Sequence, residues 1–171
     1  KQPGSRSSTV VRLALILTVV AVLIGLLVWR LGGLPGSRPA PVRVMVIGHN
    51  WWWEFVYPDL GFKTANEMHA PAGSEIQMQL TSVDVLHTFS VPELGLSAAA
   101  LPVQTSSVSV RAPDAGELGG ECSEICGTAH NMMRVKVVVD SAEDFEAWKA
   151  HQMQPAAVPQ TEQQWAGYEF V

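Results

Sequence analysis

Residues 42–57, which read VRVMVIGHNWWWEFVY, indicate the fold class of this chain. Valine, isoleucine and aromatic residues favour strands, and here they form two short runs separated by His49 and Asn50. Similar runs, each bounded by turn residues, follow at 75–82, 85–91, 105–112 and 132–139. Such spacing is typical of a β-sandwich or barrel, so the sequence predicts an all-β domain over residues 42–152.

The end of this domain favours a helix. Residues 141–152, SAEDFEAWKAHQ, begin with a serine that can cap a helix and place two acids in its first turn. Phe145 and Trp148 lie three residues apart, which predicts a narrow apolar side that packs on the sheet. The tail over residues 153–171 is weakly patterned, and we expect it to be loose or to pack on a partner.

The N-terminal region has the composition of a membrane anchor. Residues 13–29 are 17 consecutive uncharged and mostly apolar residues, flanked by Arg12 and Arg30. A secretory signal peptide and a buried core helix are the alternatives, but the run exceeds a signal peptide's apolar region and no small-residue cleavage site follows it. We therefore expect an N-terminal flank, a transmembrane helix and a Gly/Pro-rich linker over residues 1–12, 13–30 and 31–41.

Charge divides the chain in the same place. The 171 residues carry a formal net charge of −5, but residues 1–43 contain six basic residues and no acid, whereas the remainder contains five basic and sixteen acidic residues. A domain with a balance of −11 repels nucleic acid and attracts a basic partner. The length excludes a large multidomain enzyme, and two cysteines exclude a scaffold held by several disulfides.

Residues 122–133, CSEICGTAHNMM, combine the side chains of a soft metal site. Thiol, imidazole and thioether donors favour copper over calcium or magnesium. Structural zinc is the usual competitor, but it commonly takes Cys-x2-Cys pairs, whereas the spacing here is Cys-x3-Cys. Cys126, His130 and Met133 have the order of a blue-copper ligand loop, which needs one further histidine, and His87 in a predicted strand supplies it.

Cys122 adds a second thiolate to this set. Two thiolates can bridge two copper ions, with one histidine capping each, and such a centre suits rapid electron transfer. A disulfide is the alternative in an oxidising compartment, but a histidine and a methionine at these offsets favour copper. Met132 and Met133 would point to opposite faces of a strand, so we expect one to be a ligand and the other a core residue.

Together these residues resemble subunit II of haem–copper cytochrome c oxidase, whose exterior cupredoxin domain holds the binuclear copper centre called CuA. The matching segments follow the family's order and lie at residues 48–55, 64–69, 84–95 and 122–133. The resemblance implies a cupredoxin-like Greek-key β-barrel or sandwich with one N-terminal transmembrane helix. It also implies an integral protein of the bacterial plasma membrane with its copper domain on the periplasmic side.

The resemblance assigns roles to single residues. It implies that the thiolates of Cys122 and Cys126 bridge the two coppers and that the imidazoles of His87 and His130 are terminal ligands. It also implies that the thioether of Met133 is a weak axial ligand and that the backbone carbonyl of Glu124 is the other axial ligand. The carboxylate of Glu124 would also help to bind magnesium at the contact with subunit I. Trp51 would be the point at which electrons enter from a c-type cytochrome.

The implied partners are subunit I and the other oxidase subunits, a c-type cytochrome and the membrane, with no nucleic acid. The sequence departs from the family's usual pattern in three places. Residues 97–100 replace a segment that usually contains a lysine and an aspartate. Pro102-Val103-Gln104 stands where the family usually has Pro-Gly-Arg, and Leu118 stands where it has a tyrosine. These departures concern the docking of the donor and the contact with subunit I, and they leave the copper ligands intact.

Other functions remain open from the sequence. One is a mononuclear copper carrier or delivery protein, against which the second cysteine argues. Another is a quinol-oxidising relative, which would normally lack the copper ligands that are present here. A third is the CuA subunit of a nitric oxide reductase, because the terminal acceptor is determined in another chain.

Overall fold

The computed structural model describes residues 5–30, 39–155, 160–163 and 165. The chain forms two compact units, Lys1–Arg38 and Pro39–Val171. Most of the predicted linker and much of the predicted C-terminal tail lie outside the described residues.

The first unit contains helix α1 (Ser5–Arg30). Its segment Thr9–Arg30 has a mean hydropathy of 2.8, and it is long and apolar enough to cross a membrane. The helix begins earlier than the predicted residue 13, because the polar residues before the apolar run continue the same helical turns.

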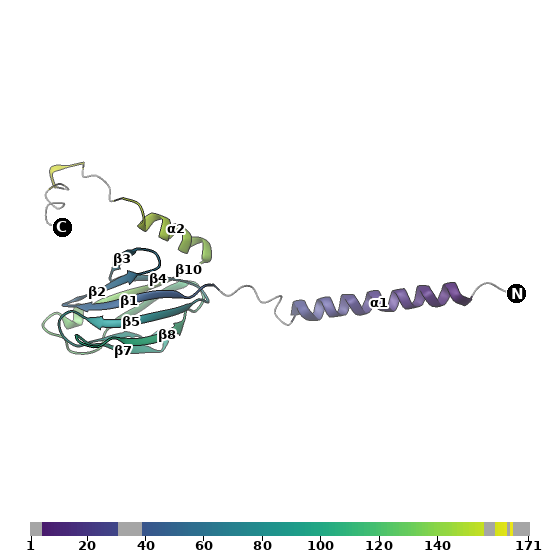
Figure 1. The fold of residues 1–171 in the computed structure, drawn as a ribbon, viewed down its shortest axis with the longest axis horizontal. Coiled ribbons are helices and arrows are strands. Elements are labelled where there is room, and N and C mark those ends of the chain that lie inside the picture. Colours follow the sequence, from purple (N-terminus) through teal and green to yellow (C-terminus); the bar gives the residue numbers. More distant parts are fainter. Residues whose placement is uncertain (1–4, 31–38, 156–159, 164, 166–171) are drawn as a thin grey trace. The chain divides into compact units, whose positions relative to one another are not determined.

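The second unit is a sandwich of two five-stranded sheets, which confirms the all-β prediction (Figure 1). In the first sheet β1 pairs with β2 in antiparallel fashion and with β5 in parallel fashion. The strands of this sheet, in spatial order, are β3 (Phe62–Ala65), β2 (Trp52–Tyr57), β1 (Val42–His49), β5 (Glu75–Ser82) and β8 (Ser106–Arg111).

The second sheet carries most of the candidate metal ligands at one of its ends. In spatial order it contains β4 (Glu67–Pro71), β10 (Arg134–Asp140), β9 (Gly116–Cys122), β6 (His87–Val91) and β7 (Leu96–Ala100). Because β9 is antiparallel to both β6 and β10, the end of β9 meets the beginnings of its two neighbours. Cys122, His87 and the loop leading to β10 therefore lie together.

The hydrophobic core lies between the sheets. Side chains alternate between the two faces of a strand, and β2 shows the alternation as half-buried and buried residues in turn. The largest fully buried side chains include Trp53, Tyr57, Phe55, Phe89 and Met68.

Helix α2 (Ala142–Gln152) closes the domain after β10, and Ser141 caps it as predicted by accepting a hydrogen bond from the backbone N–H of Asp144. Trp148 stacks on His69 with 4.2 Å between ring centroids. The ring nitrogens of His69 lie 2.8 Å from Asp140 and 2.9 Å from Glu67. The helix thus packs against β4 and β10, as the apolar spacing indicated.

Candidate metal centre

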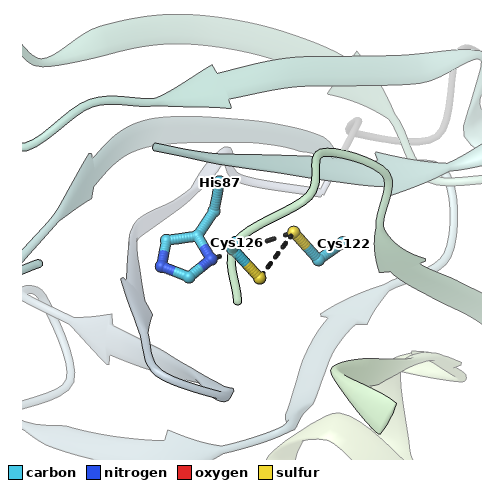
Figure 2. Close-up of side chains that lie close together, drawn as sticks. All are labelled: His87, Cys122 and Cys126. Atoms are coloured by element: carbon cyan, nitrogen blue, oxygen red, sulfur yellow. Dashed lines mark hydrogen bonds between the residues drawn. The ribbon is translucent and has the colours of Figure 1, made fainter. Parts of the chain in front are cut away.

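Three side chains from separate segments converge at the end of the second sheet. His87 begins β6, Cys122 ends β9, and Cys126 lies in the following loop. Nδ1 of His87 is 3.8 Å from Sγ of Cys122, and the two sulfurs are 3.7 Å apart (Figure 2). All three residues are buried, and their ligand atoms lie within 4.8 Å of one another. Both cysteines are free thiols, so the pair is available to a metal ion.

The remaining predicted side-chain ligands gather around Cys126. Its sulfur lies 3.7 Å from Nδ1 of His130 and 3.9 Å from Sδ of Met133. Met133 is 1% exposed, but Met132 is 74% exposed, so the expectation that the second methionine would be a core residue is wrong. The reason is that Met132 lies in the short 3-10 helix His130–Met132, before the strand begins, where strand alternation does not apply.

Glu124 presents its backbone rather than its side chain to the thiols. Its carbonyl oxygen is 3.2 Å from Sγ of Cys122, which is compatible with the axial role that the resemblance implied. Its side chain is exposed to solvent. The two chemically different parts of Glu124 therefore face different surroundings.

Trp51 lies in the turn between β1 and β2 and touches the same loop. Its indole Nε1 donates a hydrogen bond of 3.3 Å to the carbonyl oxygen of Cys126, and the residue is 37% exposed. A Cβ at Gly127 would lie 3.1 Å from this Nε1, so glycine permits the close approach. Trp52 is half-buried and Trp53 is buried, since neighbouring residues of a strand face opposite sides, whereas Trp51 precedes the strand.

The orientation of His87 depends on residues to which sequence reasoning gave no separate role. Its Nε2 lies 2.8 Å from Oδ1 of Asp84, and this leaves Nδ1 facing Cys122. A Cβ at Gly48 would lie 2.7 Å from Cδ2 of His87, so only glycine fits against this ring. On another side Trp53 packs edge-on, with 5.8 Å between ring centroids. A carboxylate three residues before a candidate histidine ligand was the signal for Asp84.

The buried thiols need a bound cation to take the place of their protons. Burial and the neighbouring Cys122 raise the pKa of the Cys126 thiol to about 11. A metal that binds both sulfurs must displace their protons and supplies the positive charge that two buried thiolates need. Two sulfurs, two imidazoles, a thioether and a carbonyl form a soft and borderline donor set, which fits copper.

The departures from the family pattern lie outside this donor set. Residues 97–100 belong to strand β7, where Ala100 pairs with His87. Val103 lies in the following loop and is 97% exposed, while Leu118 is half-buried in β9 against the core.

Comparison with known proteins places this domain in a family. Residues 61–142 match the family model described as cytochrome C oxidase subunit II, periplasmic domain. The chain is 34% identical over 107 residues to cytochrome c oxidase subunit 2 of Alkalihalophilus pseudofirmus, covering 63% of this chain and 31% of the relative. It is 36% identical over 124 residues to the subunit 2 of Thermostichus vulcanus, covering 72% of this chain and 37% of the relative.

A solved structure agrees with these sequence matches. The periplasmic domain of subunit II of cytochrome oxidase from Bradyrhizobium japonicum superposes with a TM-score of 0.63 at 28% identity, covering 65% of this chain and 92% of that one. The chain spans about a third of the length of the two curated relatives. The β-domain of this chain therefore belongs to the cytochrome c oxidase subunit II family.

Proposed function

We propose that this chain is the electron-entry subunit of a respiratory haem–copper oxidase. In this role the chain would hold a binuclear CuA centre, take electrons from a c-type cytochrome and pass them to haem in subunit I for the reduction of oxygen. The observation that carries the proposal is the pair of thiols 3.7 Å apart, each with an imidazole nitrogen of its own at 3.7 to 3.8 Å. A mononuclear carrier needs only one of these thiols.

The residues divide the work of holding the centre. Cys122 and Cys126 would hold the copper pair through their thiolates, His87 and His130 through their imidazoles, Met133 through its thioether and Glu124 through its backbone carbonyl. When bound, the copper pair supplies a one-electron carrier whose charge is shared by both ions. Burial of the thiols and the packing of Gly48 against the His87 ring restrict the movement of these ligand atoms.

Trp51 would provide the entry point for electrons. It is partly exposed, and its hydrogen bond reaches the backbone of a bridging cysteine. This gives a short covalent and hydrogen-bonded path from the protein surface to a copper ligand.

The membrane arrangement follows from the same proposal. Helix α1 would anchor the chain in the bacterial plasma membrane, with the β-domain on the periplasmic side. The exposed carboxylate of Glu124 would contribute to a magnesium site where the domain meets subunit I. Subunit I and the other oxidase subunits would then be stable partners, and the cytochrome a transient one.

Electron paramagnetic resonance of the copper-loaded full chain tests the centre. We expect two coppers per chain and one unpaired electron shared by two copper nuclei. One copper with a localised electron would instead favour the mononuclear carrier. Trp51→Ala should keep this signal and slow reduction by a c-type cytochrome. Trp52→Ala is the control, because Trp52 of β2 stacks on His49 of β1 and does not reach Cys126.

A further inference from the structure

The contact between α2 and the sandwich is built around His69, a side chain outside the candidate metal centre. His69 belongs to β4 and is 7% exposed. Its Nδ1 lies 2.8 Å from Oδ2 of Asp140, the last residue of β10. Its Nε2 lies 2.9 Å from Oε1 of Glu67, the first residue of β4. Each ring nitrogen of His69 therefore faces a carboxylate of its own.

These two contacts are both satisfied only when both ring nitrogens donate. An ionised carboxylate only accepts hydrogen bonds, whereas a neutral imidazole has one N–H and one lone pair. The hydrogen bond from His69 and the ammonium of Lys136, 2.6 Å away, hold the pKa of Glu67 below its ordinary value of 4.5. This carboxylate is therefore ionised at neutral pH. The geometry fits the imidazolium form of His69, which has an N–H for each carboxylate.

Helix α2 covers one face of the same ring. The indole of Trp148 stacks on the ring of His69, with 4.2 Å between the centroids and 13° between the planes. The face of an indole attracts a cation, so this stack is stronger with imidazolium than with neutral imidazole. Because such coupling is reciprocal, protonation of His69 and docking of Trp148 stabilise each other.

Helix α2 has few other attachments to the sandwich. Phe145 is its buried residue, at 6% exposed, and most of its other side chains face solvent. Trp148 also meets Tyr57 and Phe62 edge-on, with 5.4 and 5.2 Å between ring centroids. An element with so few buried contacts opens more readily than the core strands. The loss of one charged contact should therefore change its docking measurably.

The ionisable groups on the neighbouring strands do not titrate near neutral pH. The hydroxyl of Tyr57 in β2 accepts from the backbone N–H of His69 at 2.7 Å and donates to its carbonyl oxygen at 3.0 Å. Burial raises the pKa of Tyr57 well above its ordinary value of 10.0, so the hydroxyl keeps its proton. Lys136 in β10 lies 2.6 Å from Glu67 and 3.8 Å from Glu117 of β9. The imidazole is thus the group in this cluster that can change its charge between pH 5 and pH 8.

The cations of α2 and β3 are engaged elsewhere. Lys149 of α2 pairs with Glu146 of the same helix at 2.7 Å. Lys63 of β3 pairs with Glu54 of β2 at 2.7 Å. The other ionisable side chains of α2 are exposed to solvent, and they are those of Glu143, Asp144 and His151.

We propose that α2 is a pH-responsive element, docked on the sandwich through protonated His69 and released when the ring loses its second proton. A free imidazole takes up this proton near about pH 6.5. Because the docked helix favours the charged ring, docking is at full strength below that pH and weakens as the pH rises past it. The contribution of the Glu67 carboxylate is present above pH 4.5 and is lost as the pH falls through its lowered pKa. Release would uncover the apolar rings of Phe145 and Trp148.

Hydrogen exchange of the full chain in detergent, measured by mass spectrometry, tests this inference. At each pH the exchange of the α2 amides is divided by that of an unstructured peptide, which removes the intrinsic effect of pH. We expect the protection of α2 to fall about tenfold between about pH 6 and about pH 8.5, since one charge-assisted contact is lost. Strand β5 should keep its protection. Constant protection of α2 over this range would overturn the inference.

Replacement of His69 should remove the pH dependence. The side chain in His69→Gln can hydrogen-bond but cannot gain a charge, so α2 should show the same low protection at both pH values. His151→Gln is the matched control, because His151 is an exposed histidine of the same helix, and this variant should respond to pH like the parent. A parent-like response in His69→Gln, or a lost response in His151→Gln, would contradict the proposal.

A second variant decides the question if His69→Gln does not fold. Glu67 is half-buried, and Glu67→Gln keeps its shape while removing one of the two charges that favour the imidazolium. Release of α2 should then occur at a lower pH than in the parent. Glu121→Gln removes an acid of the same sheet that pairs with Arg134, and it should leave the pH of release unchanged. An unchanged pH of release in Glu67→Gln would overturn the inference.

Discussion

His87 and Asp84 form the contact that orients the metal centre: Nε2 of the imidazole lies 2.8 Å from Oδ1 of the carboxylate. Because the second ring nitrogen is engaged in this way, Nδ1 is the atom that faces Cys122. Metal-binding histidines commonly pair their other nitrogen with a carboxylate, which fixes both the ring and its tautomer. The carboxylate is itself held by two backbone N–H groups, from Asn50 and Val85.

Replacement of Asp84 should therefore weaken copper binding without removing a ligand. For Asp84→Ala we expect a copper affinity about 10- to 100-fold lower, since loss of such a carboxylate frees the imidazole. Competition with a copper chelator measures the change. Asp114→Ala is the control: it removes an acid from the turn that follows β8, and this variant should bind copper like the parent. An equal loss of copper affinity in both variants would argue against orientation of His87 by Asp84.

Replacement of Cys122 should remove one copper rather than the whole site. In Cys122→Ser, the side chains of Cys126, His130, Met133 and His87 still provide a blue-copper ligand set. We expect about one copper per chain and an unpaired electron localised on it, measured by metal analysis and paramagnetic resonance. Ser123→Ala changes the neighbouring exposed residue and should keep two coppers. Unchanged copper content and an unchanged optical spectrum in Cys122→Ser would contradict a bridging role.

Gly48→Ala should disturb the centre through packing alone. The added Cβ would lie 2.7 Å from Cδ2 of His87, so the ring or strand β1 must shift, at a cost of about 1–3 kcal/mol. Thermal unfolding and the copper spectrum report the two consequences. Gly116→Ala is the matched control in a strand, because nothing lies within 4 Å of its Cβ position. A Gly48→Ala variant with the parent's stability and spectrum would show that the ring has room.

Glu124→Gln should reduce magnesium binding and leave copper binding unchanged. Its carbonyl remains beside Cys122, so copper content should be unchanged. The exposed carboxylate is lost, so the assembled complex should hold less magnesium or manganese. Metal analysis of the purified complex measures both, with Glu121→Gln as a nearby control. Equal divalent-metal content in Glu124→Gln and parent would remove Glu124 from the proposed magnesium site.

Glu54 should contribute to stability only above acidic pH. Lys63, whose Nζ lies 2.7 Å away, and His49, at 3.0 Å, hold the pKa of Glu54 below its ordinary value of 4.5. A lowered pKa in the fold means that the stabilisation is present above pH 4.5 and is lost as the pH falls through the lower value. Because Lys63 is largely exposed, we expect about 0.5 kcal/mol.

Thermal unfolding of the metal-free full chain between pH 3 and pH 7 measures this contribution. Glu54→Gln should be less stable than the parent at neutral pH and equal to it at the acidic end. Glu93→Gln is the control from an exposed turn. A difference between Glu54→Gln and the parent that persists unchanged to pH 3 would have to come from packing instead.

The strands predicted from sequence were those rich in β-branched and aromatic residues. The predicted run 75–82 has the same bounds as β5, and the runs at 42–48 and 105–112 coincide with β1 and β8 to within one residue at each end. Strands β3, β4, β7 and β9 escaped prediction. Strands β7 and β9 are rich in alanine and glycine, which have little intrinsic preference for a strand. Gly120 of β9 is required by its neighbours, since a Cβ there would lie 2.5 Å from the carbonyl oxygen of Ser90.

The sequence by itself determined the donor set of the metal centre, because the affinity of a thiol, imidazole or thioether for copper belongs to the side chain and survives any fold. Only the tertiary structure decided which atoms face one another: it brings His87 to Cys122 across 35 residues of sequence and closes Gly48 against the same ring. Distances between remote segments depend on how strands pair and sheets pack, and the amino-acid composition does not specify that arrangement.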